Sequence, residues 1–146
     1  MRFRATPLTE ASLVSAIAWM IALLLSVLTS GFNFNLALGT AMAVAQVYLL
    51  ISFSVWAVLG VLVRQRASAI RLLANLSASS VIAVAATLLL LSASQQQIAA
   101  NPDQFTVEEA GMAQAKVVSL GIIYFVSAVT AGLVTYLFVT APKRQA

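Results

Sequence analysis

The chain has 146 residues, of which 62% are hydrophobic and 8% charged, and its mean hydropathy is +1.00. A water-soluble domain carries about 25% charged residues, so this composition excludes an ordinary soluble protein and indicates a membrane protein. The net charge is +4, but the basic residues stand in small groups beside apolar runs, so we expect no nucleic-acid partner. Cysteine and histidine are absent, which excludes disulfides, thiolate nucleophiles and histidine-held metal or haem; we expect no cofactor.

The first half of the chain predicts two membrane-spanning helices. The first apolar run covers residues 11–30, and the Thr6-Pro7 pair before it is typical of a helix start. This run is long for the apolar part of a cleaved signal peptide, so we expect it to stay in the protein. A short turn beginning at Gly31 leads to the second run, residues 36–63.

The second half predicts two more spans joined by a polar hairpin. The third run covers residues 67–94, the hairpin residues 95–112, and the fourth span about residues 113–140. Thr106, with a glutamate three residues later, fits a capping box, which places a helix start there. A helix over residues 106–140 would be about 52 Å long, against a hydrocarbon core of about 30 Å. We therefore expect the third and fourth helices to project beyond the outer membrane surface.

The predicted fold is an all-α integral membrane bundle of four transmembrane helices, in one domain. No alternation typical of β-strands is present. Basic residues in short loops favour the cytoplasmic side, which predicts that both termini are cytoplasmic. Only Lys116 among the basic residues then falls outside, and the inner ones are Arg2, Arg4, Arg64, Arg66, Arg71, Lys143 and Arg144. The compact chain favours a bacterial plasma (inner) membrane.

Three polar side chains within the apolar runs are candidate intramembrane contacts: Gln46, Tyr48 and Asn75. A buried amide in hydrocarbon needs a partner, so Gln46 is expected to face protein, water or a ligand. Helix-to-helix hydrogen bonding is the plainer interpretation, and a substrate contact is the alternative. Trp56 lies deep in its run, where its indole needs an acceptor.

Two charged or polar clusters lie at the predicted membrane surfaces. Arg64, Arg66 and Arg71 could hold an anionic lipid headgroup, although orientation alone also accounts for them. The outer hairpin offers polar residues for docking a partner: Gln96, Asp103, Glu108 and Glu109.

Small residues recur at four-residue spacing, which allows close packing of helices within the bundle or between protomers. Examples are Ala18 with Ala22, Gly39 with Ala43, and Ala128 with Gly132. No carboxylate falls clearly inside an apolar run, which counts against a proton-coupled carrier. No catalytic constellation can be assembled, so we expect no enzyme.

These features favour a non-catalytic membrane subunit or scaffold of a larger assembly, whose partners are membrane lipid and other membrane subunits or further copies of the chain. Two alternatives stay open. One is a homo-oligomeric channel or carrier for a small solute, and the other is a small regulatory or immunity-type membrane protein.

Overall fold

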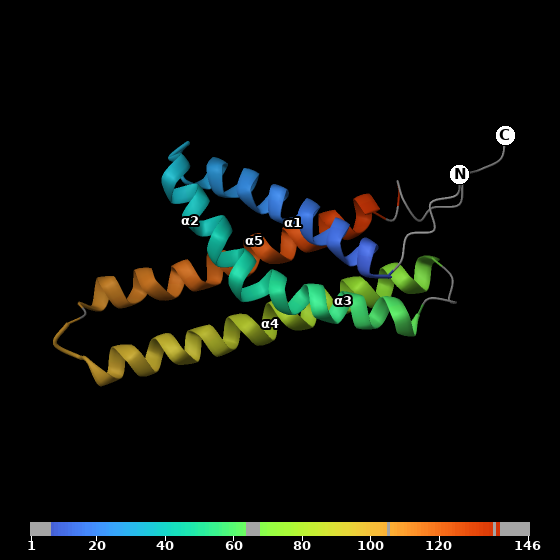
Figure 1. Ribbon diagram of the computed structural model, residues 1–146. Helices are drawn as coiled ribbons and strands as arrows, with labels where there is room; N and C mark the ends of the chain where they lie inside the picture. The colour runs from blue at the N-terminus through green and yellow to red at the C-terminus, as the bar shows by residue number, and fades with distance from the viewer. Residues whose placement is uncertain (1–6, 64–67, 105, 136, 138–146) are drawn as a thin grey trace.

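The computed structural model describes residues 7–63, 68–104, 106–135 and 137, and within these residues it contains helices and no strands. The elements in chain order are α1 (Pro7–Thr29), α2 (Phe34–Val44), the π-helical segment η1 (Ala45–Leu49), α3 (Leu50–Leu62), α4 (Ser68–Ala100) and α5 (Val107–Thr135), as Figure 1 shows. The predicted end of the last span, at residue 140, lies outside the described residues.

Four helical spans are long and apolar enough to cross a membrane, since α2, η1 and α3 form one continuous span. These spans are Leu8–Thr29, Phe34–Leu62, Ala69–Ala100 and Val107–Thr135. Large apolar side chains cover their outer surfaces; Leu24, Leu50 and Leu89 are each more than half exposed. Water does not tolerate so much exposed apolar surface, and lipid does, so this is the surface of an integral membrane protein.

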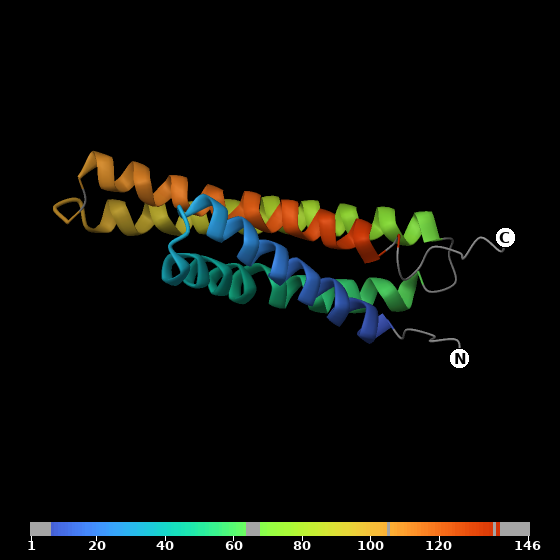
Figure 2. The ribbon, with the colours of Figure 1, turned by 90° about the horizontal axis from the view of Figure 1, so that it is seen from above.

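The helices form a bundle in which α1 contacts α2, α3 and α5, and α4 contacts α3 and α5. Figure 2 shows α4 and α5 side by side along most of their length, with α1 crossing beside them. The core contains small residues from several helices, among them Ala18, Ala22, Ala128 and Ala131, which are fully or almost fully buried. The small-residue spacing on α1 and α5 therefore serves packing within the chain.

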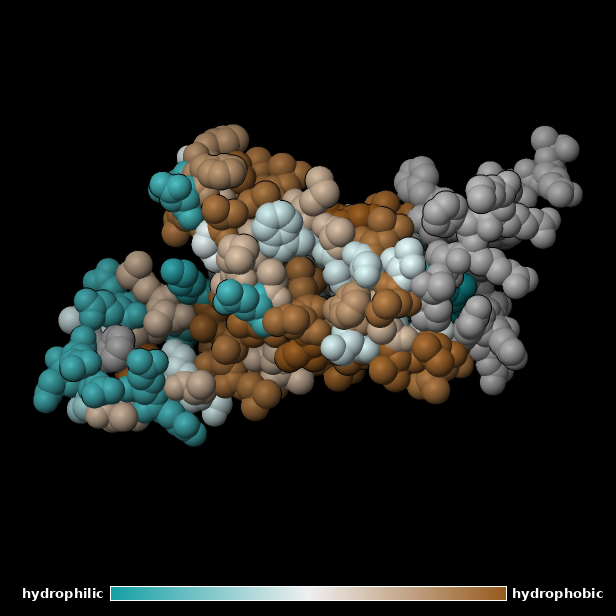
Figure 3. Space-filling model, in the orientation of Figure 1, coloured by the Kyte–Doolittle hydropathy of each residue, from teal (hydrophilic) through white to brown (hydrophobic). Residues whose placement is uncertain are grey.

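The two ends of the bundle differ. Figure 1 places the start of α1, the end of α3, the start of α4 and the end of α5 at one end. The α1–α2 turn lies at the other end, and the last part of α4 and first part of α5 extend well past it as a two-helix arm. Polar side chains gather at the tip of this arm (Figure 3). The polar stretch that follows Thr106 is therefore helical, as its capping box predicts.

Local sequence explains where the helices near this end begin and stop. Gly31 and Phe32 both have positive φ, at 65° and 66°, and the chain reverses direction at these two residues. Glycine adopts a positive φ without steric strain, which explains its place at the start of the turn. Asn33 then caps α2, because its side chain accepts a hydrogen bond from the Leu36 N–H at 3.3 Å.

The predicted capping box at the start of α5 is confirmed. The Thr106 N–H donates to Glu109 Oε2, and the Glu109 N–H donates to Thr106 Oγ1, both at 3.2 Å. Two backbone donors at the helix start are thereby satisfied reciprocally.

The second span contains a π-helical turn that the sequence pattern does not predict. The Leu50 N–H donates to the Ala45 carbonyl, five residues back, which is the π pattern. Buried positions in this span follow one another at Val44, Tyr48, Ser52 and Trp56, four residues apart. An ordinary α-helix, at 3.6 residues per turn, would rotate such a series off one face. The wider turn helps to keep these four side chains directed into the core.

Candidate functional site

The centre of the bundle holds a stacked pair of tyrosines from different helices. Tyr48 in η1 and Tyr124 in α5 are fully buried, and their ring centroids are 4.7 Å apart with an angle of 15° between the ring planes. The Tyr48 hydroxyl shares a hydrogen bond of 2.9 Å with Thr87 Oγ1 on α4, and the Tyr124 hydroxyl shares one with Ser52 on α3. Every hydroxyl in this network has a partner, so the network ties four elements together and leaves no group free for a ligand.

A second buried polar contact lies beside it. Trp56 Nε1 donates to Ser79 Oγ at 3.2 Å, which links α3 to α4 and provides the acceptor that a buried indole requires. Several other buried hydroxyls donate to carbonyls of their own helix, as Ser26 does to Ala22 and Ser127 to Ile123. Such hydroxyls are satisfied locally and carry no chemistry of their own.

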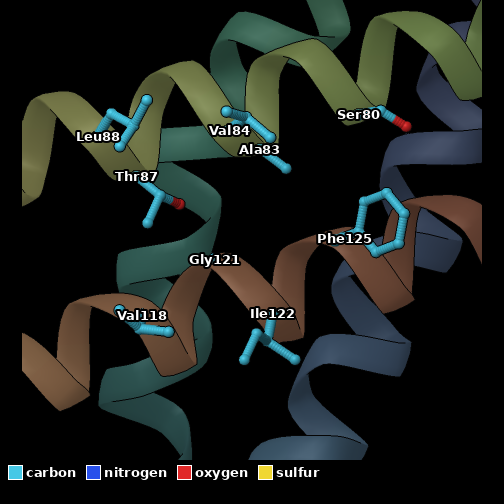
Figure 4. Close-up of a pocket in the computed structure, with 9 residues that line it drawn as sticks. All are labelled: Ser80, Ala83, Val84, Thr87, Leu88, Val118, Gly121, Ile122 and Phe125. Atoms are coloured by element: carbon cyan, nitrogen blue, oxygen red, sulfur yellow. The ribbon is translucent and has the colours of Figure 1, made fainter.

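An apolar groove of about 550 Å³ runs between α4 and α5 on the outer surface of the bundle (Figure 4). Thr87 on α4 and Gly121 on α5 face each other, and a Cβ placed on Gly121 would overlap Thr87 Oγ1. Glycine is therefore required at position 121 for α5 to pack against the threonine that holds Tyr48. The groove walls are formed mainly by Val84, Leu88, Val118, Ile122 and Phe125.

Of the three predicted intramembrane contacts, Gln46 lies in the most unusual place. It belongs to η1, near the middle of the 29-residue span Phe34–Leu62, and its side chain is exposed on the outside of the bundle. It makes no hydrogen bond to any of the described residues. Met42 and Leu50, four residues before and after it, are also exposed, at 45% and 66%. We call Met42, Gln46 and Leu50 the Gln46 face.

The three predicted polar side chains do not meet. Tyr48 is in the core, Gln46 is on the surface, and Asn75 on α4 is half-buried without a hydrogen bond to the described part of the chain. None of the three lines the α4–α5 groove. A single chain therefore does not assemble them into one binding cleft. Tyr124, Thr87 and Ser52 belong to the actual network; Tyr124 carried the same signal as Tyr48, a phenol within an apolar run.

The predicted cationic cluster is only partly described. Arg64 and Arg66 lie outside the described residues. Arg71 forms an ion pair with Glu10, and both side chains are about one-fifth exposed, at 23% and 19%. This pair joins the start of α4 to the start of α1. The guanidinium of Arg71 already has an anionic partner within the protein, a contact that sequence spacing could not reveal because 61 residues separate the two.

The residues predicted for partner docking lie on the two-helix arm or its connecting loop. Gln96, Asp103, Glu108 and Glu109 are all exposed. Glu109 uses one carboxylate oxygen in the capping box, whereas no hydrogen bond engages the side chains of Asp103 and Glu108 within the described residues. The arm thus presents exposed acidic side chains.

No protein-family model, no curated protein and no solved structure matches this chain. Among the described residues, no three acidic side chains gather where they could hold a metal ion. Within the described residues, the arrangement offers a tightly bonded core and, at Gln46, an exposed amide without a partner between exposed apolar side chains.

Proposed function

We propose that this protein is a non-catalytic subunit of a membrane assembly, and that its Gln46 face packs against a transmembrane helix of another polypeptide. The placement of Gln46 carries the proposal. An amide without a partner in hydrocarbon costs about 4–8 kcal/mol, and from the middle of a span a glutamine side chain is too short to reach either surface. A helix that offers a donor and an acceptor at this depth would satisfy it.

The rest of the bundle supports a structural role over a solute pathway. The tyrosine network and the Trp56–Ser79 contact fill the centre with side chains that are already hydrogen-bonded. Polar groups that serve a pathway face a water-filled space and exchange partners, whereas these groups fix the helices in one arrangement.

We further propose that the bundle sits in a bacterial plasma membrane with both termini cytoplasmic and the two-helix arm outside. The basic groups of the sequence support this orientation, because basic residues favour the cytoplasmic side and Arg71 lies at the end of the bundle opposite the arm.

Affinity capture of the tagged protein in mild detergent tests the subunit role. We expect the wild-type protein to bring down a defined companion, and Gln46→Leu to lose most of it, because a hydrogen bond between membrane helices is worth about 0.6–2 kcal/mol. Val58→Leu, a substitution at an exposed apolar position on α3, is the matched control and should keep the companion. A Gln46→Leu protein that retains its companion at the wild-type level would remove the Gln46 face from the interaction.

A homo-oligomeric channel is the second candidate, because one amide both donates and accepts and can therefore pair with Gln46 of a second copy. Liposomes containing the purified protein alone would show solute flux in that case, and Gln46→Leu would abolish it. Flux that is unchanged in Gln46→Leu would exclude Gln46 from any pathway.

A further inference from the structure

Two adjoining clefts lie between the α1–α2 turn and α5. Their volumes are about 420 and 310 Å³, and Leu36, Thr40, Lys116 and Leu120 line both. Figure 3 shows a hollow at this place, between the end that carries the α1–α2 turn and the arm. We call the two together the Lys116 cleft.

The Lys116 cleft lies at the level of the α1–α2 turn, since Ser30 in that turn and Asn35 in the first turn of α2 form part of its wall. Phe32 in the turn and Phe34 at the start of α2 are exposed at 76% and 61%, and aromatic side chains are typical of the membrane–water interface. The arm continues beyond this level. Lys116 therefore sits at the depth of lipid headgroups.

The charge of Lys116 is unopposed. Among the described residues, Arg71 has an ion pair with Glu10, whereas Lys116 has none, and no acidic side chain lines the cleft. The nearest acid along α5 is Glu109, whose carboxylate caps the helix start. Lys116 therefore gives the cleft a positive potential that favours an anion.

The hydroxyl groups of the cleft are not free donors. Each one that lines it donates to a backbone carbonyl near it in sequence, so that only its acceptor lone pairs remain; these are Ser26, Thr29, Ser30, Thr40 and Ser119. Donors for a ligand are the Lys116 ammonium group and the exposed Asn35 amide, both at the outer end. This arrangement suits a single anionic group held at one place.

The deeper end of the cleft is apolar. Leu120 and Ile123 follow Lys116 along α5, and Ile123 lies about 10 Å farther into the bundle. Polar at the headgroup level and apolar below it, the cleft has the same order of groups as a phospholipid. We propose that the Lys116 cleft binds one phospholipid, with its phosphate on Lys116 and Asn35 and an acyl chain along Leu120 and Ile123.

Native mass spectrometry of the detergent-purified full chain, titrated with dioleoyl phosphatidylglycerol, tests this site. We expect one lipid to bind preferentially, and Lys116→Gln to weaken that first binding by about fivefold or more, because a lysine at the headgroup attracts an anionic lipid. Lys116→Arg should retain it. Gln97→Glu on the arm lowers the net charge by the same amount and should leave binding unchanged. Equal loss in Gln97→Glu, or none in Lys116→Gln, would overturn the proposal.

Three further measurements distinguish a bound phospholipid from other occupants. Ser119→Phe keeps the lysine but fills the cleft, so it should also reduce binding; wild-type binding by this variant would contradict the proposed position of the chain. Inorganic phosphate at equal concentration should not displace the lipid, whereas equal competition would show a site for a soluble anion. Dioleoylglycerol, which lacks the phosphate, should bind at least several-fold more weakly, and equal binding would contradict the role of Lys116.

Discussion

Tyr48 and Gln46 are two residues apart, and positions so spaced on a helix point to nearly opposite faces. Tyr48 is fully buried and hydrogen-bonded, whereas Gln46 is exposed and makes no hydrogen bond to the described residues. The sequence could identify both as polar groups within an apolar run. It could not assign their faces, because their neighbours Ala45, Val47 and Leu49 are all apolar and no polar side marks the lipid-facing stripe.

Gly121→Ala is expected to destabilise the isolated protein by about 1–3 kcal/mol, because the added Cβ would overlap Thr87 and force α4 and α5 apart. Gly39→Ala is the matched control, since a Cβ there meets nothing within 4 Å and alanine favours helix. Reversible unfolding in mixed detergent micelles measures both. Equal stability of the two variants would contradict the close contact at Gly121.

At the scale of helices, the helix starts that depend on residues close together in the sequence were predictable. Proline in the first turn of α1 and the reciprocal Thr106–Glu109 bonds agree with the pattern of the sequence. α4 continues to Ala100 through the three glutamines after the apolar run, because glutamine is a good helix former. The π-helical turn was not predictable, because no glycine or proline marks it and Tyr48, which it carries, packs against Tyr124, a residue far away in the sequence.

The ion pair between Glu10 and Arg71 is expected to fasten α1 to α4. Glu10→Gln should lower the free energy of unfolding by about 1–3 kcal/mol, because it leaves a partly buried guanidinium without its partner. The double exchange Glu10→Arg with Arg71→Glu should recover part of this loss in the same unfolding assay. If the exchanged protein is no more stable than Glu10→Gln, the pair does not contribute as the geometry implies.

Removal of the arm is expected to leave membrane insertion intact and to weaken partner binding. Replacing residues 97–111 by a short Gly-Ser linker removes polar helix that makes no part of the buried core. Carbonate-resistant membrane association and companion yield are the two readouts. Poor insertion of the shortened protein would mean that this segment lies within the membrane.

At the scale of the whole molecule, the low share of charged residues and the four long apolar runs were enough to predict four membrane-spanning helices. The sequence could not predict which helices pack against each other. Small-residue spacings look alike in the sequence, yet Ala18 and Ala22 are buried between helices while Gly39 is exposed. Only the three-dimensional arrangement separates packing within the chain from surface left for a partner.

The proposed orientation predicts opposite labelling of the two ends of the bundle. The natural chain has no cysteine, so Gln65→Cys and Asp103→Cys each introduce a single thiol. A membrane-impermeant maleimide added to intact cells should label position 103 only, because the proposed orientation puts position 65, which lies between two arginines in the sequence, on the cytoplasmic side. Labelling of position 65, with protection of position 103, would reverse the orientation.

Site-specific photo-crosslinking in native membranes tests the central claim most directly. A photoreactive amino acid at position 46 should yield one discrete protein adduct, whereas the same group at Leu89, an apolar position exposed at 72% on α4, should yield none. Lipid adducts alone at both positions would show that Gln46 faces the bilayer, and would contradict a role for this face in binding another membrane helix.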